Sequence, residues 1–435
     1  MPTLTTISDI HAWVGQEVEL RGWLYNRRGS GKIAFLMLRD GTGIIQCIAS
    51  REELEVVEAD LFDRLRRLGQ ESSLIVRGVV RADERAPYCG HELHVTGAAI
   101  VAEAIDFPIT KKEHGPAFLH DNRHLWFRSR RQQAILRVRH AAVRAIREYF
   151  DEREYVLLDS PILTANACEG TSTLFATDYY GRPAFLSQSG QLYQEAGATA
   201  FRKTYCFGPT FRAEKSDTRR HLTEFWMVEP EVAWIDFDGV MDLCEDFLVN
   251  VTARVLALAR PHLIELERDI SALERVQKPF PRMSYDEACL RLAALGLPVE
   301  PEDDFGAPHE TALANTFDRP ILVHRYPTAV KAFYMKEDPQ NPARALGVDV
   351  LAPEGYGEII GGGQREDDLG VLVRKIEAHK LPMSAFSWYL DLRRYGTCPH
   401  GGFGLGVERF VTWLCGIHHI RECSPFPRTL DRLEP

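Results

Sequence analysis

The sequence lacks the patterns that mark secreted, zinc-stabilised and membrane-spanning proteins. Its nine cysteines are odd in number, and no two have the Cys-x-x-Cys spacing typical of structural zinc sites. This usage argues against a disulfide scaffold and predicts a reducing environment. There is no run of about 20 apolar residues, and the opening MPTLTTISDI has no basic start followed by an apolar stretch. We therefore expect a cytoplasmic protein with no membrane association.

An excess of positive charge is also missing, because the formal net charge is -10. Taken alone, this value argues weakly against a nucleic-acid partner. Three basic segments interrupt the acidic chain, namely residues 26–32, residues 128–133 and the group Lys215, Arg219 and Arg220. Each of them is as typical of a solvated surface as of a binding site.

Alternating apolar and polar residues over the first 104 positions predict a small β-barrel domain. The expected strands are 17–26, 32–40, 43–50, 73–83 and 92–101, with glycine-rich turns between them and one helix over 51–69. Five short strands with a helix after the third are the pattern of an OB-fold. Barrels of this type often bind single-stranded nucleic acid. The length of 435 residues leaves room for a second, larger domain.

The second domain is expected over residues 131–435, after a polar hinge at 105–130. Apolar residues at helical spacing predict a long amphipathic helix over 131–154. The extended segments that follow do not alternate regularly with helices, so an antiparallel sheet flanked by helices is favoured over a doubly wound parallel sheet. Residues 236–327 have a helical and then mixed pattern, which we interpret as an insert. The fold class is therefore α+β.

The segment GPTFRAEKSDTRRHLTEFWMVEPE, residues 208–231, predicts a hairpin that presents charge and an aromatic ring on one surface. Arg212 and Glu214 are two residues apart, so on a strand they would share a face. Phe225 lies on the second strand. A cation for phosphate, an acceptor for a base amino group and a ring for stacking suit a nucleotide. Without further support, a charged surface hairpin is the simpler interpretation.

Two glycine-rich segments nearer the C-terminus could meet the same ligand. In residues 348–366, Asp349 and Glu358 offer the oxygen ligands that magnesium prefers, and three glycines precede Arg365. In GFGLGVER, residues 402–409, glycine at every second position would strip one face of a strand of side chains, so that a flat ligand or a neighbouring backbone could approach it. Arg409 then begins the next helix. Either segment alone is weak evidence.

Taken together, the segments Phe211-Arg212-Ala213-Glu214, EIIGGGQR and GFGLGVER resemble the signature of class II aminoacyl-tRNA synthetases. The helix from Arg131 towards Pro161 is similar to the first motif of that class, through which its members form homodimers. An OB domain ahead of this core resembles the subgroup for aspartate, asparagine and lysine. The stretches SGQLYQE, VKAFYMK and WYLDLRRYGT are similar to the asparaginyl enzymes. The resemblance implies an ATP-dependent ligase that makes asparaginyl-adenylate from L-asparagine and transfers the amino acid to tRNA.

Carried over position by position, the resemblance implies four sets of residues. The ATP site would comprise Arg212, Glu214, His221, Phe225, Glu358, Gly406 and Arg409, of which Arg212, Glu214 and Arg409 are expected to act in catalysis. The amino-acid site would comprise Glu169, Ser189, Gln191, Gln194, Glu229 and Arg365. Asp349 and Glu358 correspond to the magnesium-binding acids. Arg28, Phe35 and Gln46 correspond to residues that bind the anticodon.

The resemblance also implies individual roles within these sets. Arg212 would hold the α-phosphate, Glu214 the adenine amino group, and Phe225 would stack on the base. Glu169, Ser189 and Gln191 would bind the ammonium group of the amino acid. Glu408 would support the nucleotide site from behind.

The choice between asparagine and aspartate depends on one position. The related aspartate enzymes have Gln-Ser-Pro-Gln, an aromatic residue and then a lysine that pairs with the substrate carboxylate, whereas this chain has Gln194 at the lysine position. Loss of a fixed cation weakens binding of a buried anion. An amide instead needs a donor, for which we expect Arg365, and an acceptor, for which Glu229 is the candidate. Glu229 could alternatively bind the ammonium group. An aspartyl-tRNA synthetase, possibly non-discriminating, remains the alternative function, followed by an asparagine synthetase on the same core and a non-catalytic RNA-binding protein.

Overall fold

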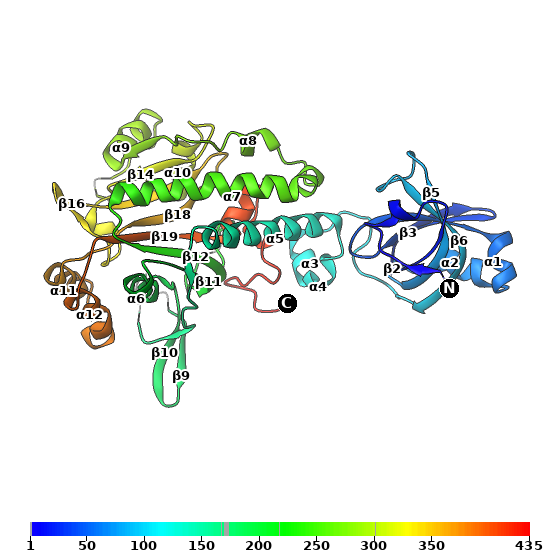
Figure 1. The fold of residues 1–435 in the computed structure, drawn as a ribbon, viewed down its shortest axis with the longest axis horizontal. Coiled ribbons are helices and arrows are strands. Elements are labelled where there is room, and N and C mark those ends of the chain that lie inside the picture. Colours follow the sequence, from blue (N-terminus) through cyan, green and yellow to red (C-terminus); the bar gives the residue numbers. More distant parts are fainter. Residues whose placement is uncertain (1, 167, 169–173, 217, 301) are drawn as a thin grey trace. The chain divides into compact units, whose positions relative to one another are not determined.

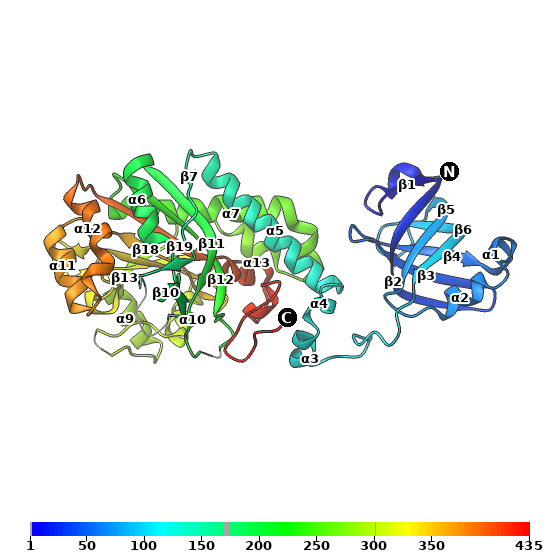
Figure 2. The same cartoon turned by 90° about the horizontal axis from the view of Figure 1, so that it is seen from below.

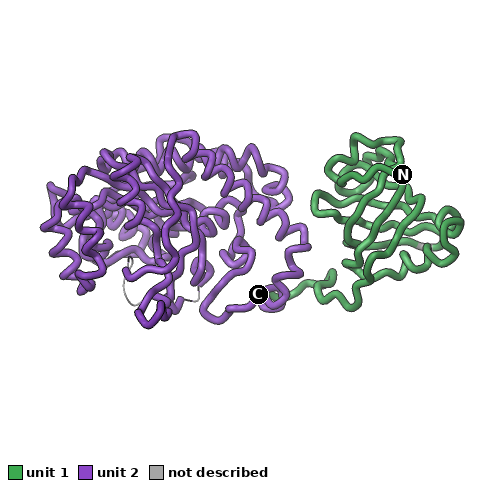
Figure 3. The backbone as a smooth tube through the Cα atoms, turned by 60° about the horizontal axis from the view of Figure 1, so that its bottom comes forward, with its two compact units in different colours: residues 1–116 green, residues 117–435 purple. Residues whose placement is uncertain are grey.

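The computed structural model describes residues 2–166, 168, 174–216, 218–300 and 302–435. The chain divides into two compact units, residues 1–116 and residues 117–435, which are coloured separately in Figure 3. The division falls inside the segment 105–130 that the sequence predicts as a hinge. Each unit has a hydrophobic core of its own.

The N-terminal unit is the expected OB-fold barrel. Its strands are β1 Thr3–Leu4, β2 Glu17–Ser30, β3 Ile33–Arg39, β4 Ile44–Ser50, β5 Ser73–Ala82 and β6 His91–Ala102. They are ordered β1-β2-β3-β4-β6-β5, and an additional pairing of β2 with β5 closes the barrel. Alternate residues such as Val18, Leu20, Leu36 and Leu38 are fully or almost fully buried, as the alternating pattern predicts. The barrel strands are therefore predictable from the sequence to within a few residues.

The single helix predicted over 51–69 is two helices, α1 Arg51–Val57 and α2 Leu61–Arg67. The backbone at Glu58 is extended, with φ -153° and ψ 125°, and this interrupts the helical run. Asp60 precedes α2 and Asp63 lies in its first turn. Negative charge is favoured at the start of a helix by the helix dipole. The local sequence thus supports a new helix start that periodicity alone does not reveal.

The C-terminal unit is built on an eight-stranded sheet in the order β13-β14-β17-β18-β19-β12-β11-β7. The neighbours from β14 to β11 pair antiparallel, and the outermost pairs at both edges are parallel. These strands are β7 Val156–Leu157, β11 Lys203–Phe211, β12 Glu224–Ala233, β13 Arg282–Ser284, β14 Ile321–His324, β17 Gly347–Ala352, β18 Gly357–Gln364 and β19 His400–Gly406. The expected antiparallel sheet flanked by helices is confirmed.

Two long helices, α5 Arg130–Asp151 and α7 Phe237–Glu265, run side by side along the sheet (Figures 1 and 2). Their aromatic residues Tyr149, Phe150 and Phe247 pack against one another and onto Phe403 of β19. By length and composition α7 is apolar enough to cross a membrane, and here its buried side chains belong to the core of this unit. Residues 236–327 therefore include a core helix and strand β14 of the central sheet. They are part of this domain rather than an insert in it.

The remaining elements surround the sheet. The further helices are α3 Pro116–Asp121, α4 Arg123–Trp126, α6 Gln191–Phe201, α8 Ile270–Glu274, α9 Tyr285–Ala294, α10 Ala307–Ala314, α11 Leu369–Ala378, α12 Ser387–Arg394 and α13 Val407–Cys415. The further strands are β8 Leu163–Thr164, β9 Ala176–Tyr179, β10 Arg182–Leu186, β15 Glu337–Asp338 and β16 Asn341–Ala345. The hairpin of β9 and β10 projects away from the central sheet (Figure 1).

The glycines of β19 serve two different purposes. A Cβ at Gly402 would lie 1.9 Å from the backbone oxygen of Pro230 on β12, so this glycine is required by the close approach of the neighbouring strand. A Cβ at Gly406 would come no closer than 3.9 Å to another atom, those of Arg409. The alternation in the sequence therefore combines a packing requirement at Gly402 with an open strand end at Gly406.

We expect Gly402→Ala to lower the free energy of unfolding by about 1–3 kcal/mol or more, because the added methyl group must displace backbone atoms. Gly208→Ala on β11 is the matched control, since no atom lies within 4 Å of a Cβ at that glycine. The control should change the free energy of unfolding by no more than about 0.5 kcal/mol. Denaturant unfolding followed by circular dichroism measures both. Equal stability of the two variants would contradict the close approach of β12 and β19.

Candidate active site

The predicted hairpin is formed by β11 and β12, which pair antiparallel from Lys203 with Val232 to Phe211 with Glu224. Strand β11 ends at Phe211, so Arg212 and Glu214 lie in the connecting loop and not on the strand as predicted. The ladder nevertheless continues by one bond, because the Arg212 amide donates to the Thr223 carbonyl at 2.9 Å. This bond holds the Arg212 guanidinium 5.4 Å from the centre of the Phe225 ring. The cation and the aromatic ring are thus brought to the same place by a different local structure.

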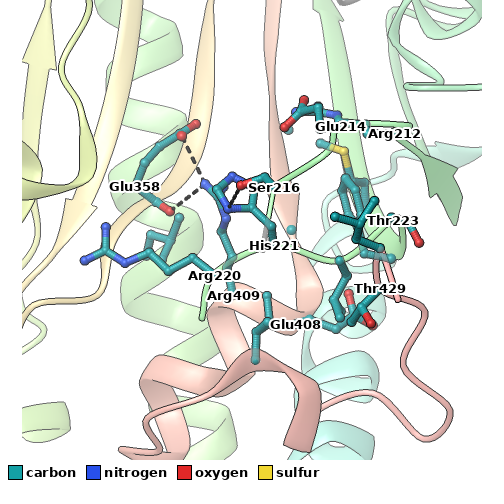
Figure 4. Close-up of a pocket in the computed structure, with 18 residues that line it drawn as sticks. Arg212, Glu214, Ser216, Arg220, His221, Thr223, Glu358, Glu408, Arg409 and Thr429 are labelled. Atoms are coloured by element: carbon teal, nitrogen blue, oxygen red, sulfur yellow. Dashed lines mark hydrogen bonds and ion pairs between the residues drawn. The ribbon is translucent and has the colours of Figure 1, made fainter. Parts of the chain in front are cut away.

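A cavity of about 810 Å³ opens beside this hairpin. Figure 4 shows Arg212 and Glu214 on one side of it and Glu358, Arg220 and Arg409 on the other. Gly404 and Gly406 of β19 also contribute to its wall, where they leave the strand without side chains. Every residue predicted for the ATP site lines this cavity: Arg212, Glu214, His221, Phe225, Glu358, Gly406 and Arg409.

Arg409 and Glu358 form an ion pair across the floor of the cavity. The Arg409 Nη1 donates to Glu358 Oε2 at 3.1 Å and to the Glu358 carbonyl at 3.2 Å. Burial raises the pKa of the Glu358 carboxyl, but the cations around it, Arg409 first, hold that pKa below its ordinary value. Glu358 is therefore an anion at neutral pH.

Glu408 fixes the start of α13 in place. Its carboxylate accepts a bond from the Arg139 guanidinium on α5 at 2.6 Å and one from the Trp226 amide on β12 at 2.9 Å. The side chain of Glu408 is buried. This agrees with the expectation that Glu408 supports the site, because it sets the position from which Arg409 enters the cavity.

The loop between β11 and β12 adds further donors. His221 Nδ1 is 2.5 Å from the Thr218 hydroxyl, and burial followed by the nearby Arg409 lowers the pKa of its imidazole, which favours the neutral ring. Arg220, which the sequence suggested only as part of a basic group, also lines the cavity. Its guanidinium donates to the Thr311 hydroxyl at 2.6 Å and to Glu310 at 3.3 Å. Because these partners lie about 90 residues away in the chain, no local signal identifies Arg220.

A second cavity of about 1060 Å³ adjoins the first. The two share Arg212, Met227, Glu358 and Gly404 in their walls. Four residues predicted for the amino-acid site line this second cavity: Ser189, Gln191, Glu229 and Arg365. A ligand lying across both cavities would therefore pass the Arg212 guanidinium at their junction.

Glu229 on β12 is buried in the wall of the second cavity. One carboxylate oxygen accepts from the Ser189 hydroxyl, and the other accepts from the Gly190 amide at 2.7 Å. Burial raises the pKa of the Glu229 carboxyl above its ordinary value, although the bonds from Ser189 and Gly190 oppose this shift in part. The same two bonds fix the positions of both carboxyl oxygens in the wall of the cavity.

Arg365 enters the same cavity with its charge already balanced. Its Nε donates to Glu231 Oε1 at 3.1 Å and its Nη2 to the same atom at 2.5 Å. The Arg365 side chain is 2% exposed and that of Glu231 is fully buried. The sequence analysis missed Glu231, although it stands two residues from Glu229 and so shares a strand face with it. This pairing fixes the direction of the guanidinium.

One residue predicted for the amino-acid site, Gln194, does not line the second cavity. The amide nitrogen of Gln194 donates to the Leu158 carbonyl at 2.8 Å and to the Ser160 hydroxyl at 3.1 Å, so its side chain is directed away from the second cavity. The reason is the packing of α6 against the segment around Leu158 and Ser160, which supplies both acceptors. Glu169 lies outside the described residues.

Asp349 and Glu358 lie together over Gly361. A Cβ at Gly361 would be 3.0 Å from Glu358 Oε1 and 3.6 Å from Asp349 Oδ1. Lys331 donates to Asp349 at 2.7 Å, while burial and the neighbouring Glu358 charge raise the pKa of Asp349 to about 6. Converging oxygen donors suit magnesium, which keeps part of its shell for water and phosphate. In the described ranges no group of three or more His, Cys, Asp or Glu residues could hold a metal, so any ion would need such outside ligands.

The predicted anticodon residues form one cluster on the barrel of the N-terminal unit. Arg28 on β2 donates to Gln46 on β4 at 2.9 Å, and its guanidinium lies 5.1 Å from the centre of the Phe35 ring on β3. The Gln46 amide nitrogen in turn donates to Glu92 on β6 at 2.5 Å. Glu92 was not predicted, because its strand is distant in sequence. The cluster offers a stacking ring beside polar groups whose directions are fixed.

Comparison with known families matches both units. Residues 116–430 match the model of class II tRNA synthetases (D, K and N), and residues 18–101 match that of the OB-fold nucleic acid binding domain.

Individual proteins match the chain over its full length. A protein of Sorangium cellulosum named asparagine–tRNA ligase is 56% identical over 100% of this chain and 99% of its own length. A protein of the same name from Desulforamulus reducens is 53% identical over 99% of each. The crystal structure of asparaginyl-tRNA synthetase from Pyrococcus horikoshii complexed with asparaginyl-adenylate has a TM-score of 0.96 and 43% identity, covering 100% of both chains. The similarity thus extends over both units of the chain.

Proposed function

The chain belongs to the class II tRNA synthetases for aspartate, lysine and asparagine. We propose that it is an asparagine–tRNA ligase that binds ATP in the first cavity and asparagine in the second. One observation carries this proposal. The second cavity presents a paired guanidinium, Arg365, and a carboxylate, Glu229, next to a nucleotide-sized cavity that it joins at Arg212. A donor and an acceptor in one wall complement the two ends of an amide. The Pyrococcus protein holds asparaginyl-adenylate, which is the product of the first step proposed below.

In the first step the asparagine carboxylate attacks the α-phosphorus of ATP, and pyrophosphate leaves. The Arg212 guanidinium lies at the junction where that phosphorus would sit, so it can stabilise the charge that grows on the phosphoryl oxygens. Phe225 offers its ring to the adenine, and Arg409 and Arg220 lie where the outer phosphates would extend. In the second step the terminal ribose hydroxyl of the tRNA attacks the adenylate carbonyl and releases AMP. Both steps depend on positioning and charge rather than on a protein nucleophile.

Magnesium is part of this proposal as an ion held by Asp349 and Glu358 that would neutralise phosphate charge. The fit of the site supports it. The two carboxylates converge over a glycine that leaves space between them, and only oxygen atoms are offered. Burial first, and then the charge of Glu358, raise the pKa of Asp349, and a bound cation would lower it by favouring the anion.

The preference for asparagine over aspartate follows from the charges around the second cavity. Glu229 is buried and already accepts bonds from Ser189 and Gly190, so a substrate carboxylate beside it would be a second buried acidic group without a donor. Arg365 is already paired with Glu231 and is therefore not a free cation for an acidic side chain. Gln194, at the position of the lysine in the aspartate enzymes, contributes no charge. An uncharged amide meets these constraints, whereas a carboxylate does not.

We also propose a cytoplasmic homodimer. Strand β7 lies at the edge of the sheet, and Val156, Leu157, Ile162 and Leu163 in its neighbourhood are each between 36% and 46% exposed. Exposed apolar side chains beside an unpaired strand edge favour pairing with another chain.

The nine cysteines are free thiols in the structure, which supports a reducing compartment. The matches to OB-fold domains and to asparagine–tRNA ligases support tRNA as the partner.

Pyrophosphate exchange with asparagine and aspartate in parallel tests the proposed substrate. We expect kcat/KM for asparagine to exceed that for aspartate by a factor on the order of 10⁴, because an acidic side chain would leave the polar groups of the pocket wrongly paired. Equal activity with the two amino acids would show a non-discriminating enzyme, and a preference for aspartate would overturn the assignment.

Arg212→Ala should lower kcat/KM for pyrophosphate exchange by about 10²–10³, since it removes the cation at the reacting phosphorus. Binding of tRNA, measured by filter retention, should stay within about twofold, because the change leaves the barrel of the N-terminal unit untouched. Arg219→Ala in the same loop is the control, because Arg219 bonds to His418 and does not line the nucleotide cavity. An Arg212→Ala enzyme that activates asparagine at the wild-type rate would refute the role given to Arg212.

Phe35→Ala should raise the KM for tRNA by about 10-fold or more, as expected for the loss of one base-stacking contact. Amino-acid activation without tRNA should not change. Trp23→Ala provides the control, because Trp23 is opposite Arg39 and so lies four residues along β3 from Phe35, a distance of about 13 Å. If both variants bind tRNA equally well, the cluster of Arg28, Phe35 and Gln46 is not the anticodon site.

A further inference from the structure

A fully buried carboxylate, that of Glu195 on α6, lies behind the amino-acid cavity. It accepts hydrogen bonds from the Arg393 guanidinium at 2.7 Å and the Tyr389 hydroxyl at 2.8 Å, and it lies 2.9 Å from His400 Nε2. The fourth partner is the Gln191 amide nitrogen, which donates at 3.1 Å. Three of these partners come from α12 and β19, far from α6 in the sequence. None of the roles proposed above uses Glu195.

The surroundings of Glu195 keep it ionised. Burial raises the pKa of its carboxyl, but Arg393 and His400 lower it more, so that the pKa lies below its ordinary value. The Arg393 and Glu195 side chains are both fully buried, and such a pair persists only when each charge is well bonded. An ionised carboxylate accepts hydrogen bonds and cannot donate them.

This charge state determines how the Gln191 amide is turned. Gln191 and Glu195 are four residues apart on α6 and therefore share one face of the helix. Because Glu195 only accepts, it must receive the NH₂ end of the Gln191 amide. The carbonyl oxygen of Gln191 is then left for the second cavity, which the Gln191 side chain lines. A cationic ligand group requires just such an acceptor.

We propose that Glu195 is a positioning residue for the ammonium group of the amino acid, acting through Gln191. The inference rests on the proposed function, in which Gln191 binds that group. Ser189 does not replace it, because the Ser189 hydroxyl donates to Glu229 and accepts from the Gln191 backbone amide at 3.1 Å. Glu195 thus converts an amide, which could present either end, into an acceptor of fixed direction.

The variant Glu195→Gln tests this role with almost no change in shape. A glutamine can donate as well as accept, so the Gln191 amide would no longer be held with its oxygen towards the substrate. The measurement compares two ligands, L-asparagine and succinamate, which is asparagine without its amino group. We expect the Kd of asparagine to rise by about 10-fold or more, as for the loss of a hydrogen bond to a charged group, while the Kd of succinamate and the KM for ATP stay within about twofold. A general loosening of the pocket would weaken both ligands, and that result would overturn the proposal, as would unchanged binding of asparagine.

Three further variants extend the test, and the first of them keeps it decisive if Glu195→Gln is unstable. Gln191→Leu removes the amide but leaves the Arg393, Tyr389 and His400 bonds to Glu195, and it should show the same selective loss for asparagine. Adding Glu195→Gln to Gln191→Leu should have no further effect on asparagine binding if Glu195 acts through Gln191. Tyr389→Phe is the matched control, because it removes one donor and keeps the carboxylate ionised, and it should leave the ratio of the two Kd values unchanged. An additive effect in the double variant would overturn the proposal.

The experiment gives different results if the proposed substrate is wrong and if the proposed role of Glu195 is wrong. If the wild-type protein prefers aspartate, the same comparison can be made with aspartate and succinate, because the inference concerns only the ammonium group. A selective loss for the amino compound would then support the role of Glu195 while the assignment of asparagine is withdrawn.

Discussion

The structure of the catalytic unit depends on carboxyl groups that stand close together on neighbouring strands of the central sheet and are held in place by fixed hydrogen-bond donors. Glu229 and Glu231 stand on β12, and Glu358 stands on β18, which is separated from β12 only by β19. Arg365 balances Glu231, and Arg409 balances Glu358. Buried ion pairs contribute little to stability relative to apolar packing, and removing one partner is costly. Their concentration beside two cavities is therefore explained by ligand binding rather than by folding.

The same arrangement explains why strand β19 contains so much glycine. The strand separates β12 from β18, both of which supply charged side chains to the cavities. A side chain at Gly402 would meet the backbone of β12, and a side chain at Gly404 would meet the end of Met227. Because Gly402, Gly404 and Gly406 alternate with residues that have side chains, one face of β19 leaves room for the acids of its neighbours and for a flat ligand above them. The glycine pattern therefore matters as much for the packing of the protein as for the nucleotide.

The features that could be predicted best from the sequence are those that short segments encode. The barrel strands, the long helix α5 and the residues around the nucleotide cavity were all identified from local patterns and from the resemblance that these patterns supported. The predicted position of Arg212 on a strand is wrong, since strand β11 stops one residue before it. Its side chain nevertheless lies beside Phe225, as predicted. The direction of Gln194 could not be predicted, because it depends on how α6 packs against the segment around Leu158. Glu231 and Glu195 were missed because their partners, Arg365 and Arg393, are 134 and 198 residues away.

These long-range pairs determine where the amino-acid cavity presents hydrogen-bond donors and where it presents acceptors. Each side chain that faces the substrate is held from behind by a group that determines whether it donates or accepts. Glu231 fixes the direction of the Arg365 guanidinium, the Ser189 hydroxyl and the Gly190 amide fix the Glu229 carboxyl, and Glu195 accepts the hydrogen bond from the Gln191 amide nitrogen. Asparagine and aspartate have nearly the same shape, so a pocket can separate them only by the charge and direction of its hydrogen bonds. A site whose donors and acceptors are fixed by buried charges can do so, because changing any one of them would leave another buried group without a partner.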